Sequence, residues 1–164
     1  MTTAAQPINK SSATKTILLS GLVAGTLDIL AAFSVYSVIM KVVTPAQILK
    51  GIAAVAFGKT IIGNETIMAL LGLLFHFIIA YSFAAAYFFI YPYAKFLHYN
   101  KIISGLLYGI IVWAIMNLIV VPLFNGHHGP FILNAMLRAV TILMLCIGLP
   151  IAIITARYYK NTMR

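Results

Sequence analysis

The chain has 164 residues, of which 63% are hydrophobic and only 8% are charged. A soluble monomer of this composition would expose too much apolar surface, so the composition excludes an ordinary water-soluble domain and indicates an integral membrane protein. The formal net charge of +9 comes from basic residues between and beside the apolar stretches, not along one face with interleaved aromatic residues. This distribution argues against nucleic acid as a partner and is typical of topology signals.

Four apolar stretches are each long enough to cross a bilayer, which takes roughly 20 residues. We therefore predict an all-α bundle of four transmembrane helices in one membrane domain, residues 16–156. A flexible cytoplasmic tail, residues 1–15, precedes it and a basic cytoplasmic tail, residues 157–164, follows it. The predicted spans are residues 16–40, 66–90, 102–124 and 131–156.

The first stretch also has the charged and apolar regions of a cleavable signal peptide. Its apolar run is too long for a typical signal, however, and it contains Asp28 at its middle. We therefore predict that it is retained as the first span.

A short helix is predicted between the first two spans, from Pro45 to about Phe57. Thr44, Pro45 and Gln47 fit an N-cap, a first-turn proline and a capping-box partner. Its apolar residues fall on one face, which suits a helix lying in the membrane interface. The other interpretation is a helix packed over the ends of the spans, and the sequence does not decide between them.

The basic residues predict the orientation of the spans. Seven lysines and arginines lie on the side that holds both termini and the second loop, against three on the other side. Both termini are therefore predicted to be cytoplasmic. The three lysines of the first loop, Lys41, Lys50 and Lys59, oppose this orientation.

Each span carries a polar side chain that hydrocarbon disfavours. At about 1.5 Å per residue, these side chains fall in one layer, at the membrane midplane or just outside it. The candidate layer comprises Asp28, His76, Asn117, Asn134 and Arg138.

Small residues mark the faces on which the helices can approach closely. Gly21 and Gly25 form one GxxxG motif, Gly105 and Gly109 form another, and Gly72 lies one turn before His76. We predict that these are the packing faces. The polar layer then points into the bundle.

Two interpretations of the polar layer compete. In the structural one, Asp28 and Arg138 form an ion pair, and Asn117, Asn134 and His76 complete its hydrogen bonds. In the functional one, the layer is a ligand site or proton path, in which Asp28 and His76 exchange protons and Arg138 holds an anion.

The remaining candidate ligands are weak. His127 and His128 are adjacent in the third loop, but no Cys, Asp or Glu lies nearby to complete a metal site, which favours a solvated turn. Cys146, the only cysteine, lies inside the fourth span and is interpreted as a small buried residue. No cofactor is predicted.

Four segments of the chain, residues 21–30, 71–80, 108–123 and 147–153, carry a resemblance to known proteins. They resemble a group of small four-helix bacterial inner-membrane proteins of unknown function, the YagU-like proteins. The resemblance implies this fold and a location in the bacterial cytoplasmic membrane, and it brings no catalytic residues. Asp28, His76 and Asn117 lie within the resembling segments, whereas Arg138 does not.

Taken together, these patterns predict a small polytopic membrane protein whose partners are the lipid bilayer and either further copies of itself or another membrane protein. The leading function is that of an accessory or oligomerising component that uses its GxxxG faces. The alternative is binding or transport of a small molecule or ion by the polar layer. An enzyme ranks third, because no nucleophile with a base and an orienting group can be assembled from these residues.

Overall fold

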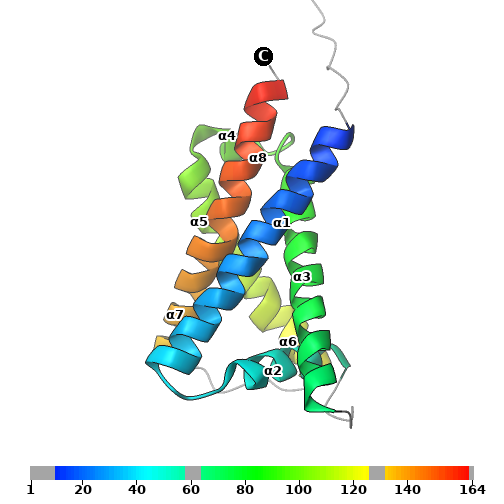
Figure 1. The fold of residues 1–164 in the computed structure, drawn as a ribbon. Coiled ribbons are helices and arrows are strands. Elements are labelled where there is room, and N and C mark those ends of the chain that lie inside the picture. The colour runs from blue at the N-terminus through cyan, green and yellow to red at the C-terminus, as the bar shows by residue number, and fades with distance from the viewer. Residues whose placement is uncertain (1–9, 58–63, 126–131, 163–164) are drawn as a thin grey trace, which may run out of the picture.

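The computed structural model describes residues 10–57, 64–125 and 132–162, and the regular elements in these ranges are all helical. Four long helical spans form a bundle, and a short helix, α2 (Pro45–Phe57), lies across one end of it (Figure 1). Each of the four spans is long and apolar enough to cross a membrane. The chain is thus a multi-pass membrane protein with the predicted all-α architecture.

Three of the four spans contain a π-helical segment, and the second span is α-helical throughout. The spans, in chain order, are α1 (Lys10–Ala32) with Phe33–Ile39; α3 (Glu65–Ile90); α5 (Lys101–Ala114) with Ile115–Val120 and α6 (Val121–Asn125); and α7 (Leu133–Leu143) with Met144–Gly148 and α8 (Leu149–Thr162). The four-residue helix α4 (Phe96–Tyr99) lies between the second and third spans.

The capping box at the start of α2 forms as predicted. The backbone N–H of Thr44 donates to the Gln47 side-chain oxygen over 2.8 Å, and the N–H of Gln47 donates to Oγ1 of Thr44 over 3.2 Å. The helix then packs against α3 and α6, with Gly72 of α3 against the backbone of Leu49. These contacts favour the interpretation that α2 covers the ends of the spans.

Both ends of the membrane domain extend farther as helix than the sequence indicates. The first helix begins at Lys10, and α8 continues to Thr162 through most of the predicted C-terminal tail. The second extension has a clear cause, because Tyr158 and Tyr159 are buried with their ring centroids 5.1 and 5.2 Å from that of Phe88 on α3. Burying aromatic rings stabilises the last turns of α8 against the bundle.

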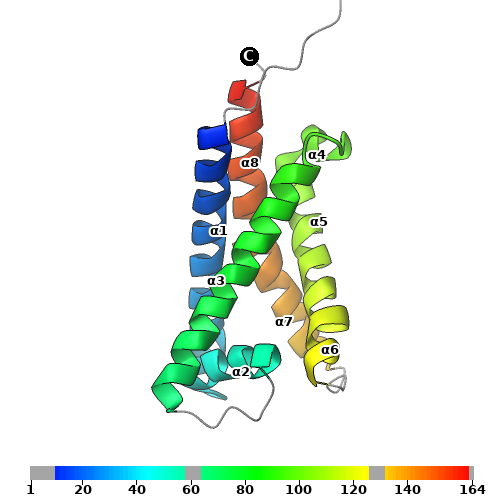
Figure 2. The same cartoon turned by 90° about the vertical axis from the view of Figure 1, so that its right-hand side faces the viewer.

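The bundle is packed most tightly at the end where α1 begins and α8 ends. Tyr87, Phe88, Tyr91 and Tyr159 belong to the buried core there. Toward the end with α2, the described residues of Phe33–Ile39, Ile115–Val120 and α7 include none that is fully buried. Figure 2 shows α3 diverging from the third span toward this end, with α2 crossing the space between them.

Candidate functional site

A histidine and a carboxylate lie together where α1 crosses α3. The Nε2–H group of His76 donates a hydrogen bond of 2.8 Å to the backbone carbonyl oxygen of Gly25. Asp28, one turn farther along α1, is within electrostatic range of the His76 ring and of the Cys146 thiol. The three side chains come from the first, second and fourth spans. Of the predicted layer, this group contains Asp28 and His76, whereas Cys146 was not predicted to belong to it.

Arg138 does not join this group. Among the described residues the one ion pair joins Lys50 of α2 to Glu65 of α3, over 2.7 Å, so the predicted pair between Asp28 and Arg138 is absent. The cause is depth. Cys146 lies near Asp28, and Arg138 precedes Cys146 by eight residues, which is about 12 Å along a helix. The acid and the base of the spans therefore occupy separate layers.

A second layer surrounds Arg138. Its Nε atom and the Nε1 atom of Trp113 are buried and have no hydrogen-bond partner in the described part of the chain. Gly109 of α5 lies against the backbone of Met144 on the fourth span, and this contact gives a common reference depth. Measured along the helix axes toward the end with α2, Trp113 lies about 6 Å from this depth and Arg138 lies about 9 Å from it. Both nitrogens can only donate. Two unpartnered donors thus lie at nearly the same depth on neighbouring helices.

Asn117 and Asn134 lie on the outside of the bundle, contrary to the prediction that both point inward. The Asn117 side chain donates to the carbonyl of Trp113 on its own helix, over 3.0 Å. For Asn117, the prediction failed because it stepped four residues at a time from Gly109, whereas Ile115–Val120 is π-helical. Hydrogen bonds from i to i+5 widen the turn and rotate later residues off the packing face.

The five glycines that were predicted to be at packing faces all contact other parts of the same chain. Gly21 and Gly25 lie against α3, Gly72 lies against α2, and Gly105 and Gly109 lie against the fourth span. The two GxxxG faces are therefore filled within one molecule.

The described residues hold no cluster of three or more His, Cys, Asp or Glu side chains that could bind a metal ion. His127 and His128 lie outside the described residues.

An apolar groove of about 450 Å³ lies between α2, α3 and the third span. Ile52 of α2, Ile79 of α3 and Met116 of the third span are among its lining residues. It presents almost no polar surface, so it suits hydrocarbon and not a charged ligand.

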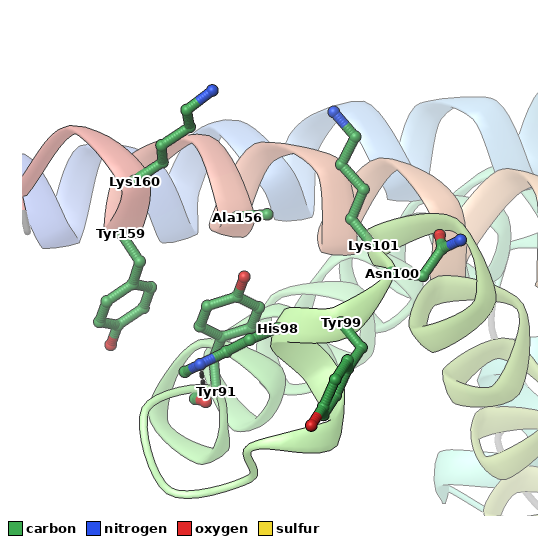
Figure 3. A pocket seen from close by; sticks show the side chains of 8 residues that line it. All are labelled: Tyr91, His98, Tyr99, Asn100, Lys101, Ala156, Tyr159 and Lys160. Carbon is green, nitrogen blue, oxygen red and sulfur yellow. Dashed lines mark hydrogen bonds between the residues drawn. The ribbon is translucent and has the colours of Figure 1, made fainter.

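A second pocket, of about 530 Å³, lies at the opposite end of the bundle, between the start of α5 and the end of α8. Figure 3 shows Lys101 and Lys160 extending to the same side of this pocket, with the rings of Tyr91, Tyr159 and His98 gathered on the other side. The His98 Nε2–H donates to the Tyr91 carbonyl oxygen over 2.9 Å.

Neither a free donor at Trp113 nor a pocket at this end of the bundle was predicted from the sequence. The sequence nevertheless contains a signal for each. Trp113 is the only tryptophan of the chain and is far from the ends of its span, where tryptophan is usually found. The only acidic residues are Asp28 and Glu65, so the lysines of the second loop and of the C-terminus have no nearby carboxylate in the sequence.

No family model, curated protein or solved structure matches the chain. The resemblance to the YagU-like proteins, and the bacterial inner-membrane location that it implies, therefore stay predictions. Function has to be inferred from the chemistry of these residues.

Proposed function

We propose that the protein binds, and passes across the membrane, a small anion or carboxylate-bearing molecule, which is held inside the bundle by Arg138 and Trp113. The observation that carries this proposal is the pair of buried donors without a protein partner, Nε of Arg138 and Nε1 of Trp113. Two groups that can only donate, one of them permanently charged, match a ligand that supplies acceptor oxygens or negative charge.

The energetics of the membrane interior support a ligand at this position. A guanidinium inside a span is costly unless a counter-charge or hydrogen-bond acceptors surround it. Asp28, the only acid within the interior of the spans, does not supply that charge, because it lies in the other layer. An anion bound at Arg138 would supply it.

The layer that holds Asp28 and His76 adds a proton-exchanging group to the same path. The Nε2–H of His76 is held by the carbonyl of Gly25, so the neutral ring leaves Nδ1 to accept a proton beside Asp28. Protonation there would bring positive charge into the core together with the anion.

Trp113 makes the proposal directly testable, because it is the only tryptophan in the chain. The protein in lipid nanodiscs would be titrated with chloride, phosphate, acetate and benzoate while tryptophan emission is recorded. We expect a saturable change with at least one of the four. Arg138→Met should weaken that response at least tenfold, while Arg157→Gln, which removes an exposed arginine near the end of α8, should leave it within about twofold.

A flat emission signal for all four anions would contradict the proposal, and an Arg138→Met variant less stable than the wild type would then assign Arg138 a structural role. Native mass spectrometry of the same nanodiscs would show independently whether a non-lipid adduct is retained.

An accessory or oligomerising role is the second candidate. The GxxxG faces cannot serve it, because they are filled within the chain. Asn117, Asn134 and Thr141 favour it, since they lie on the outer surface of the third and fourth spans, and polar side chains on such a surface promote contacts between helices. A subunit count above one that falls to one in Asn117→Leu would support this role.

A further inference from the structure

The end of the bundle opposite α2 carries positive charge that no acidic side chain of this protein neutralises. The chain has two acidic residues. Glu65 is paired with Lys50 beside α2, and Asp28 lies within the first span. The cations at this end whose side chains the structure describes are Lys15, Lys95, Lys101, Arg157 and Lys160, all exposed. None of them is paired with an acidic side chain in the described part of the chain, so they are available to an anion from outside.

Two of these cations line the 530 Å³ pocket. Lys101 is the first residue of α5 and Lys160 lies in the last turn of α8, so the antiparallel third and fourth spans bring the two together. In Figure 3 they stand on either side of Ala156, with both ammonium groups directed away from the rings. The pocket is therefore a hollow with two point charges at its rim.

The aromatic side of the pocket is held in place by contacts within the protein. Tyr91 and Tyr159 stack with their ring centroids 5.0 Å apart and their planes at 22°, and each is only 6% exposed. His98 lies 4.6 Å from the Tyr91 ring, centroid to centroid, and its Nε2–H is bonded to the Tyr91 carbonyl. This side is thus formed before any ligand binds, which lowers the entropic cost of binding.

The start of α5 adds to the positive potential. The Asn100 side-chain oxygen caps this helix by accepting from the N–H groups of Ile102 and Ile103, over 2.9 and 3.3 Å. Its amide NH₂ is left as a donor beside Lys101. The N-terminal end of a helix also favours negative charge.

We propose that this pocket binds a phosphate group, with Lys101 and Lys160 contacting its oxygens and Asn100 donating to it. The lipid headgroup is the favoured source, because the second, third and fourth spans reach the membrane surface here and the pocket is lined by tyrosines at that level. Basic pockets between transmembrane helices are suited to anionic lipid headgroups. Free inorganic phosphate offers the same chemistry.

The test compares two pairs of substitutions that remove equal charge from the same end. The pocket pair is Lys101→Gln with Lys160→Gln. The control pair is Lys95→Gln with Arg157→Gln, whose side chains are exposed and do not line the pocket. Each protein is placed in nanodiscs of phosphatidylcholine with 20% phosphatidylglycerol, and native mass spectrometry measures the phosphatidylglycerol retained.

We expect the pocket pair to reduce the amount of retained phosphatidylglycerol at least tenfold. The control pair should reduce it less than threefold. Lys101→Arg with Lys160→Arg should restore retention, because charge is kept. If the pocket pair does not fold, Lys101→Gln and Lys160→Gln are each compared with the control pair instead.

A second arm uses pure phosphatidylcholine nanodiscs with millimolar inorganic phosphate. Free phosphate is identified as the source, with the same residues, if phosphate binding in these nanodiscs is saturable and is abolished by the pocket pair, and if phosphate added to the first set of nanodiscs displaces phosphatidylglycerol. Equal losses in the pocket and control pairs would overturn the proposal, because the effect would then be general surface charge. Retention of neither phosphatidylglycerol nor phosphate by the wild type would also overturn it.

Discussion

The imidazole of His76 on α3 donates its Nε2–H to the carbonyl oxygen of Gly25 on α1, over 2.8 Å. The bond joins the first and second spans within the membrane and fixes which ring nitrogen carries the proton. Close approach of the helices makes it possible, because a Cβ at Gly25 would lie 3.0 Å from the Phe77 ring.

Removing this bond should have a small, measurable cost. We expect His76→Ala to lower the free energy of unfolding by about 1 kcal/mol through the lost hydrogen bond, and by more through the lost ring contacts. His76→Gln, which keeps an N–H donor, should recover part of the loss. Unfolding with SDS in mixed micelles would measure both variants, and an unchanged stability for His76→Ala would show that the bond contributes nothing.

Gly148, the one glycine of the fourth span, should be difficult to replace. A Cβ there would collide with backbone atoms of Gly105 and Gly109, and backbone cannot move aside as a flexible side chain does. We expect Gly148→Ala to destabilise the bundle by about 1–3 kcal/mol.

Gly51 provides the matched control for this substitution. It lies in the middle of α2, and a Cβ there would have no atom within 4 Å. Gly51→Ala should raise stability by up to about 1 kcal/mol through helix propensity. Equal effects of the two alanines would contradict the packing described between the third and fourth spans.

Ser104 and Tyr87 form a buried hydroxyl pair that links α5 to α3. The two oxygens are 2.8 Å apart, and the Ser104 hydroxyl also donates to the Lys101 carbonyl over 3.3 Å, so Tyr87 is the donor to Ser104. Ser104→Ala leaves the Tyr87 hydroxyl buried without this acceptor, which should cost about 1–3 kcal/mol.

The double variant Ser104→Ala with Tyr87→Phe should be more stable than Ser104→Ala alone, since neither polar group then remains. Ser34→Ala is the control, because this exposed serine bonds only to its own helix. Its effect should stay within about 0.5 kcal/mol. Additive effects of the two core substitutions would show that Ser104 and Tyr87 do not interact.

The two ends of the bundle should lie on opposite sides of the membrane. In a Cys146→Ala background, Tyr99→Cys and Val42→Cys would place single thiols at exposed positions, at the last residue of α4 and before α2. The basic-residue count predicts that a membrane-impermeant maleimide applied to intact cells labels position 42 and not position 99. The reverse pattern would invert the orientation, and labelling at both positions would contradict a four-span topology.

Much of the architecture follows from local sequence. The spans are determined by uninterrupted apolar runs, since a bilayer requires about 20 such residues in helical form. The start of α2 is determined by Thr44 and Gln47, because a capping box is satisfied by residues within one turn of each other. The end of the fourth span was harder to predict, because Tyr158 and Tyr159 extend α8 through contacts with Phe88, which lies 70 and 71 positions away in the sequence.

The sequence by itself thus determined that four helices cross the membrane, that a capped helix follows the first, and that polar side chains lie within the spans. Only the tertiary structure decided how those side chains are placed. Asp28 lies within electrostatic range of His76, Arg138 and Trp113 each bury a donor that has no partner in the described part of the chain, and Asn117 faces outward. The physical reason is that depth and facing depend on helix crossings and on π-helical turns. A π-helical turn changes the angular position of every later residue around the helix axis. A prediction that assumes 3.6 residues per turn throughout does not include this change.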